Sequence, residues 1–166
     1  QPASNAIYIF ENPQVFEEVI AGLNHDDNPG AYQSYASNGQ ATALPTLICT
    51  SGWPSAAALI LLDLLMAQPP ANSLYYSGDF DLAGLQIAAS LLARYPGRCH
   101  PWRFDPDSYL LAIHAEGATA SASDLAALAT LPDVFAPLVT IMQEQGHWAY
   151  QEGITHVLLE EVKKPG

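Results

Sequence analysis

The sequence predicts an α/β fold in which a parallel four-stranded sheet is sandwiched by helices. Up to about residue 104, short apolar runs alternate with helix-like patterns, and polar or glycine-rich residues follow the first three runs. This alternation favours a right-handed parallel sheet. The chain has 166 residues, of which 49% are hydrophobic, and this is enough for one domain with a substantial core.

Four apolar segments are expected to form the strands, because β-branched and aromatic residues are typical of buried strands. They are residues 6–10, 46–50, 74–77 and, more weakly, 99–104. Helical spacing predicts three helices between them. Pro13 suits the first turn of the first helix, and Pro54 with Ser55 opens the second. The third helix follows Asp81 and is apolar nearly all round, so we expect it to be buried against the sheet.

The remaining segments have other patterns. Residues 24–43 are polar and are predicted to form a loop or an insertion. Beyond the fourth strand, we expect a tail of short helices that packs on one side of the sheet. These helices are expected at about 105–114, from a cap at Ser123 and Asp124, at about 132–145 and at 151–162, with a small-residue linker at 117–123.

We predict a single domain over residues 1–166, with a core at about 6–113 and a helical tail at about 114–166. Because the chain starts at Gln1, close before an apolar strand and without an initiator Met, we expect it to be a C-terminal fragment of a longer protein, with processing as the alternative explanation. The longest apolar stretch, residues 56–66, is too short to span a bilayer, so no membrane association is expected.

The composition limits the partners of the chain. It has 17 acidic and 5 basic residues and a formal charge of -12, so its own surface repels nucleic acid. The only cysteines, Cys49 and Cys99, have no zinc-like spacing. A reducing cytoplasm fits this content, and a single disulfide is the alternative.

The most informative motif places two aspartates after the third strand. Asp79 and Asp81 lie one residue apart in a turn between Gly78 and Gly84. Two carboxylates this close repel each other unless a cation or a shared proton relieves them. Mg²⁺ is the usual cation in such sites, because it binds carboxylates together with phosphate oxygens. The structural alternative is that both aspartates serve only as turn and helix-cap residues.

Glu11 follows the first strand, and in a parallel sheet the carboxyl ends of strands lie along one edge. We therefore expect Glu11, Asp79 and Asp81 to converge within metal-bridging distance. Three carboxylates there suit one or two Mg²⁺ ions, or Mn²⁺, and a phosphodiester substrate. The structural alternative is that Glu11 only places a negative charge in the first turn of the following helix, where it interacts favourably with the helix dipole.

Weaker candidates surround this edge. Residues Ser51, Gly52 and Ser55 lie at a helix N-terminus that suits a phosphate group, and an ordinary capped turn is the favoured alternative. A substrate phosphate is one partner for Arg103, and a surface ion pair is the other. An accessory acidic role is considered for Glu152, against a simple helix-start charge.

The order of these motifs resembles the Toprim domain of topoisomerases, primases and related nucleases. The segment Ile7 to Asn12 resembles the motif with the lone glutamate, and Ser77 to Gly84 resembles the Asp-x-Asp motif of the topoisomerase VI A-type branch. The stretches FENP, CTSGWPSAAAL, GDFDLAGLQIA and PWRFDPDSY are also similar to a bacterial family, domain of unknown function 2399.

The resemblance implies a Toprim-like, Rossmann-like fold and Mg²⁺-dependent DNA cleavage. Glu11 would act as acid, base or metal ligand, and Asp79 and Asp81 as metal ligands. The family resembles the nuclease subunit of Wadjet anti-plasmid systems, which are encoded with a condensin-like SMC-type ATPase. The chain would then join an SMC-type ATPase complex and reach DNA through other domains or subunits. Metal-activated water is favoured as the nucleophile over a tyrosine from elsewhere in the protein.

Two other classes compete with the nuclease. A phosphatase of the haloacid dehalogenase type also uses Asp-x-Asp, but its motif normally follows the first strand and carries a Thr or Val where this chain has Ala83. A non-catalytic Toprim-like scaffold that binds a partner is the third reading. Metal binding separates this scaffold from the two enzymes.

Overall fold

The centre of the computed structural model is a parallel sheet of four strands. The structure describes residues 6–24, 45–68, 72–115 and 117–163. The strands lie in the order β2, β1, β3, β4, and every neighbouring pair is parallel. Their bounds are β1 Ala6–Phe10, β2 Thr46–Cys49, β3 Ser73–Ser77 and β4 Cys99–Pro101. The predicted α/β fold is therefore confirmed, and the fourth strand is shorter than expected.

The register of β1 and β3 brings their carboxyl ends to the same level. Phe10 pairs with Ser77, and the backbone N–H of Glu11 donates to the Ser77 carbonyl at 3.0 Å. Glu11 and Gly78 are consequently the first residues beyond the sheet on adjacent strands. This adjacency makes contact possible between side chains that lie far apart in the sequence.

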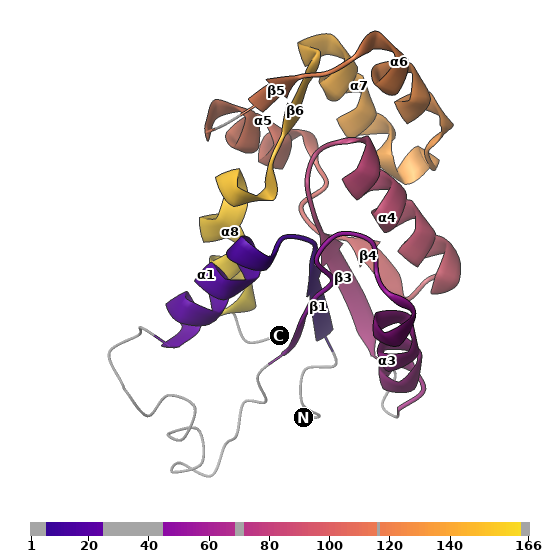
Figure 1. The fold of residues 1–166 in the computed structure, drawn as a ribbon, viewed down its shortest axis with the longest axis vertical. Helices are drawn as coiled ribbons and strands as arrows, with labels where there is room; N and C mark the ends of the chain where they lie inside the picture. The colour runs from indigo at the N-terminus through magenta and orange to yellow at the C-terminus, as the bar shows by residue number, and fades with distance from the viewer. Residues whose placement is uncertain (1–5, 25–44, 69–71, 116, 164–166) are drawn as a thin grey trace.

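Helices cover both faces of the sheet. Figure 1 shows α1 and α8 on one side and α3 and α4 on the other. Their bounds are α1 Pro13–Asn24, α3 Ala56–Met66, α4 Leu82–Arg94 and α8 Thr155–Val162. As predicted, α4 is largely buried, and it contributes Leu85, Ile87 and Leu91 to the core.

The starts of these helices follow local sequence signals. Pro13 is the first residue of α1, as predicted, where its missing N–H removes no helical hydrogen bond. The Ser55 hydroxyl accepts from the backbone N–H of Ala58 at 3.2 Å and so caps α3.

The C-terminal part forms a layer beyond the carboxyl edge of the sheet, seen above β1 and β3 in Figure 1. It contains α5 Pro106–Ala115, β5 Gly117–Thr119, α6 Ala122–Ala127, α7 Ala136–Gln145 and β6 His147–Ala149, with short 3-10 turns at Leu128–Thr130, Asp133–Phe135 and Gln151–Ile154. Phe80 and Ala149 exchange backbone hydrogen bonds of 2.9 and 3.3 Å. This bridge joins the layer to the turn after β3.

Three expectations for the tail were wrong. Residues 117–119 form β5 and not a linker. Their small side chains carry no strand pattern, and they become a strand because they pair with β6. Ser121, rather than Ser123, caps α6, since its hydroxyl accepts from the Asp124 N–H at 3.1 Å. The tail also does not pack only on one side of the sheet. Helix α8 lies beside α1 on one face, whereas the elements from α5 to β6 cover the carboxyl edge of the sheet.

The remaining sequence-based predictions concern the cysteines, the membrane and the polar segment. Cys49 and Cys99 are free thiols, so the disulfide alternative is wrong. In the described part of the chain, no helix has the length and apolar character needed to cross a membrane. The predicted loop or insertion at 24–43 lies outside the described residues, except for Asn24, which ends α1.

Candidate functional site

Glu11 lies at the end of β1, half-buried beneath the turn that follows β3. Its Oε2 accepts two hydrogen bonds, one from the Tyr76 hydroxyl at 3.0 Å and one from the backbone N–H of Asp79 at 3.1 Å. Burial and the nearby Asp79 carboxylate raise the pKa of Glu11 to about 7. A carboxyl group with this pKa can take up or release a proton near neutrality.

Two glycines allow the turn to close over the Glu11 carboxylate. A Cβ atom at position 78 would lie 2.1 Å from Glu11 Oε2, and one at position 84 would lie 2.2 Å from the Asp79 carbonyl oxygen. At position 84 the clash is with backbone, so a side chain there would force the turn itself to shift. At position 78 the clash is with the Glu11 carboxylate and the Tyr76 hydroxyl, so a side chain there would displace these two groups from their hydrogen bond.

Asp79 is held from the opposite end of the chain. Its Oδ1 accepts from the backbone N–H of Gln151 at 2.8 Å. Burial raises the pKa of Asp79 to about 6, and the charges of Asp81 and Glu152 add to this effect. Like Glu11, Asp79 has a second oxygen that accepts no hydrogen bond from a described residue.

Asp81 caps α4. Its Oδ1 accepts from the Gly84 N–H at 2.7 Å, and its backbone is extended as in other N-caps. The cap role considered from the sequence is thus confirmed. The carboxylate still contributes to the field that raises the pKa values of Glu11 and Asp79.

Two side chains of the C-terminal segment, those of Gln151 and Glu152, accept hydrogen bonds at this edge. Asn12 Nδ2 donates to Glu152 Oε1 at 2.8 Å, and Gln151 Oε1 accepts from the Asn12 N–H at 3.1 Å. Glu152 is exposed, and its charge acts on Asp79. The structure therefore places Glu152 at the acidic edge, as considered from the sequence.

Sequence reasoning missed three residues of the site. Tyr76 was predicted only as part of a strand, although it lies three residues before Asp79 and its spacing was a usable signal. Asn12 directly follows Glu11. Nothing in the sequence pointed to Gln151, because its partners are 139 and 72 residues away.

The chain matches the model of one protein family over residues 1–162, a range that includes every residue of the site. That family is described as "Protein of unknown function C-terminus (DUF2399)". The chain belongs to the DUF2399 family. Among curated proteins, the comparison gave no significant match. Since one match contains both the Glu11 and the Asp79 segments, the DUF2399 resemblance seen in the sequence is confirmed.

The candidate ligands of this DUF2399 chain are carboxylate oxygens, which are the ligands that a hard divalent cation such as Mg²⁺ prefers. Glu11, Asp79 and Asp81 each keep one carboxylate oxygen that no hydrogen bond from a described residue uses. The placement is less complete, because the described residues hold no group of three or more His, Cys, Asp or Glu arranged to hold a metal ion. The expected convergence within metal-bridging distance is therefore not reached, and each carboxylate accepts a backbone N–H instead.

The loop after β2 forms a second side of the edge. Ser51 and Gly52 both have positive φ, 53° and 83°, and the Gly52 N–H donates to the Glu11 carbonyl at 3.1 Å. The hydroxyl of Ser55 is used as the α3 cap. These contacts are those of an ordinary capped turn, and a phosphate contact by the three residues stays a prediction.

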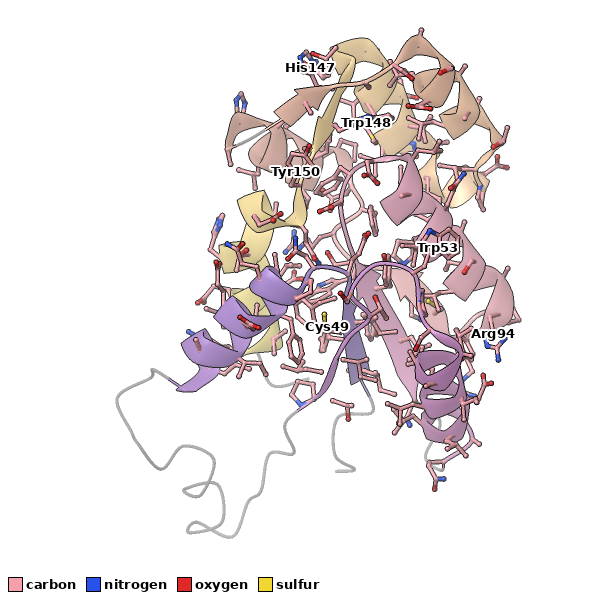
Figure 2. The ribbon with its side chains drawn as sticks, in the orientation of Figure 1. Cys49, Trp53, Arg94, His147, Trp148 and Tyr150 are labelled. Carbon is pink, nitrogen blue, oxygen red and sulfur yellow. The ribbon has the colours of Figure 1, made fainter. Side chains whose placement is uncertain are left out.

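The arginines of the DUF2399 chain are engaged elsewhere. Arg103 forms an ion pair with Glu161 on α8. The Glu161 carboxylate also accepts a hydrogen bond from Trp102 Nε1 at 2.6 Å. The ion pair considered from the sequence is thus present. Figure 2 shows Trp53 and Arg94 on the side of the molecule that carries α3 and α4, whereas Tyr150 lies in the C-terminal layer above Cys49.

Proposed function

We propose that this DUF2399 domain is a Toprim-type nuclease that hydrolyses DNA phosphodiesters with Mg²⁺ or Mn²⁺. One observation carries the proposal: the Glu11 carboxylate accepts the N–H of Asp79 at 3.1 Å, at the carboxyl edge of a parallel sheet. Open α/β folds place their chemistry at this edge. The Toprim likeness of the two motifs supports the same reading, and the DUF2399 match over residues 1–162 includes both motifs.

The carboxylates divide into two roles. Asp79 and Asp81 would hold the cation through Oδ2, the oxygen of each that accepts no hydrogen bond from a described residue. Glu11 Oε2 is already saturated by Tyr76 and Asp79, so Oε1 is the atom that takes a proton from an attacking water. A pKa of about 7 suits a general base. A bound Mg²⁺ would supply charge stabilisation for the phosphate.

Water is the nucleophile in this proposal. Tyr76 is the tyrosine that contacts Glu11, but it is fully buried, and burial together with the Glu11 charge raises its pKa. Its hydroxyl therefore stays protonated and serves as a donor. A tyrosine from another part of the protein is the alternative nucleophile.

DNA would be held by other domains or subunits, because the chain carries a formal charge of -12. By resemblance to Wadjet systems, we propose an SMC-type ATPase complex as the partner. In that arrangement the chain contributes the cutting site, and its partners contribute the positive surface.

A non-catalytic scaffold is the second candidate. One observation favours it: the carboxylates are engaged by backbone N–H groups, and no described group of three is arranged to hold a metal. Calorimetric titration with Mn²⁺ decides between the two. Binding that Asp79→Asn removes favours the nuclease, and absence of binding favours the scaffold.

The nuclease proposal is tested by nicking of supercoiled plasmid DNA by the full-length protein with Mg²⁺ or Mn²⁺. Glu11→Gln should lower the rate by about 10²- to 10⁴-fold, the range for loss of a general base. Asp79→Asn should abolish nicking. The matched control is Asp133→Asn, which removes the same charge from an exposed position outside the site.

Nicking at the wild-type rate by Asp79→Asn would remove the carboxylates from the mechanism. Hydrolysis of a generic phosphate ester that is lost in Asp79→Asn, without DNA nicking, would instead support the phosphatase reading.

A further inference from the structure

Gln151 connects the C-terminal segment to both strands that carry the acidic site. It lies in the 3-10 turn after β6 and is fully buried. Its backbone N–H donates to Asp79 Oδ1 at 2.8 Å, while its side-chain Oε1 accepts from the Asn12 N–H at 3.1 Å. One residue thus binds the segment after β1 and the segment after β3.

The orientation of the Gln151 carboxamide follows from these partners. Because the Asn12 backbone N–H is a donor, only the carbonyl end of the carboxamide can face it. Nε2 must then point the other way. Among the described residues, it is the one buried side-chain nitrogen or oxygen without a hydrogen-bond partner.

The unpaired Nε2 argues against a packing role for this side chain. A buried donor without a partner is unfavourable, and an apolar residue of similar shape avoids that loss. What the carboxamide supplies, and an apolar side chain does not, is the acceptor for Asn12. The hydrogen bond to Asn12 is therefore the contact that distinguishes glutamine at position 151.

Asn12 is itself held by hydrogen bonds of its side chain. Its Oδ1 accepts from the Gln14 N–H at 2.8 Å at the start of α1, and its Nδ2 donates to Glu152. Asn12 follows Glu11 directly, so the position of the turn at 151–152 is set relative to Glu11. The same turn sets the side chain of Asp79.

We propose that Gln151 is a positioning residue for the Asp79 carboxylate: its side chain fixes the turn to Asn12, and its backbone N–H then fixes Asp79 Oδ1 and leaves Oδ2 free. That this orientation of Asp79 serves to bind a cation rests on the proposed function. Gln151 itself touches neither cation nor substrate in this proposal.

The test compares Gln151→Met and Gln151→Glu with the wild-type chain by Mn²⁺ titration calorimetry. Methionine has a similar shape and lacks the acceptor, so Mn²⁺ affinity should fall about 10- to 100-fold, the range for residues that orient metal ligands. Gln151→Glu keeps an acceptor for Asn12 and should retain more affinity than Gln151→Met. Unchanged affinity in a folded Gln151→Met overturns the proposal.

Tyr109→Phe is the matched control for loss of one buried hydrogen bond. The Tyr109 hydroxyl donates to the His147 carbonyl at 2.8 Å in the same C-terminal layer. The Tyr109 ring packs against Phe80, but its hydroxyl makes no hydrogen bond with Asp79 or Gln151 among the described residues. The variant should lower the melting temperature without changing Mn²⁺ affinity. An equal loss of affinity in Tyr109→Phe would reduce Gln151 to a merely structural role.

A second readout separates this proposal from the proposed function. In metal-free protein, NMR detects the hydrogen bond between the amide at position 151 and the Asp79 carboxylate. Gln151→Met should weaken it, and an intact bond would overturn the positioning role. If the wild-type chain binds no Mn²⁺ while this bond depends on Gln151, the metal-dependent function fails and the positioning role stands.

Discussion

The Tyr76 hydroxyl donates to Glu11 Oε2 at 3.0 Å, and the backbone N–H of Asp79 donates to the same oxygen at 3.1 Å. Both donors come from β3 or the turn that follows it, whereas Glu11 comes from β1. The two hydrogen bonds favour the ionised form of Glu11, while burial and the Asp79 charge oppose it. The balance leaves Glu11 with a pKa of about 7.

Tyr76→Phe should raise the pKa of Glu11 above about 7, because it removes a donor that favours the carboxylate. Loss of this hydrogen bond should also lower the free energy of unfolding by about 1 kcal/mol. Carbon-detected NMR titration of the glutamate carboxyl groups measures the pKa. Tyr109→Phe removes a hydroxyl of similar burial and should leave the pKa of Glu11 unchanged; an unaltered value in Tyr76→Phe would refute the role of Tyr76.

Stability should fall as the pH rises through the pKa values of the site. In the native state, the pKa of Glu11 rises from 4.5 to about 7 and that of Asp79 from 3.8 to about 6. Between about pH 4 and 7 the native state therefore binds more protons than the unfolded chain. This contribution is fully present below that window and is lost as the pH passes through the native pKa values.

The double variant Glu11→Gln with Asp79→Asn isolates this effect, since its two groups do not titrate. Urea unfolding at several pH values should show the variant gaining free energy of unfolding, relative to wild type, from pH 4 to 8. Other carboxyl groups affect both proteins alike and cancel in the comparison. Parallel pH profiles for the two proteins would contradict the prediction.

Gly84→Ala should destabilise the protein, although alanine normally favours a helix by about 1 kcal/mol over glycine. The added Cβ would lie 2.2 Å from the Asp79 carbonyl oxygen, and the backbone must shift to accommodate it. The expected loss is about 1–3 kcal/mol, as for other overpacked sites. Thermal melting checks this, with the exposed change Gln86→Ala on the same helix as the control; a raised melting temperature in Gly84→Ala would show that the turn is loose.

Arg103→Ala tests whether this arginine serves α8 or a substrate phosphate. It removes the ion pair with Glu161, while Trp102 still donates to that carboxylate. We expect a loss of stability of up to about 1 kcal/mol and an unchanged rate of plasmid nicking. Arg94→Ala, which removes the more exposed pair with Asp63, is the control. A fall in nicking specific to Arg103→Ala would support a phosphate contact.

The sequence was sufficient for the sheet and for the approach of Glu11 to Asp79. Glu11 directly follows β1, Asp79 lies two residues beyond the end of β3, and strand ends in a parallel sheet share one edge. The order of the strands did not follow from the apolar pattern, so the direct adjacency of β1 and β3 became visible only in the structure.

The features that the sequence did not predict depend on contacts between residues that lie far apart in the chain. β5 has the sequence GAT, which carries no strand pattern and becomes a strand because β6 pairs with it. Gln151 binds residues from the first half of the chain, and no periodicity reports such a contact. The same limit applies to Tyr76, whose hydroxyl has a partner 65 residues away.

The backbone bridge between Phe80 and Ala149 bears on how the chain can be shortened. The sequence pattern alone suggests a boundary at about residue 114, between the core with the strands and the helical tail. A protein cut there would keep Glu11 and Asp79 but lose the segment that encloses them. A shortened form of this chain that keeps these contacts to Phe80, Asp79 and Asn12 must therefore extend at least through the turn at Gln151–Ile154.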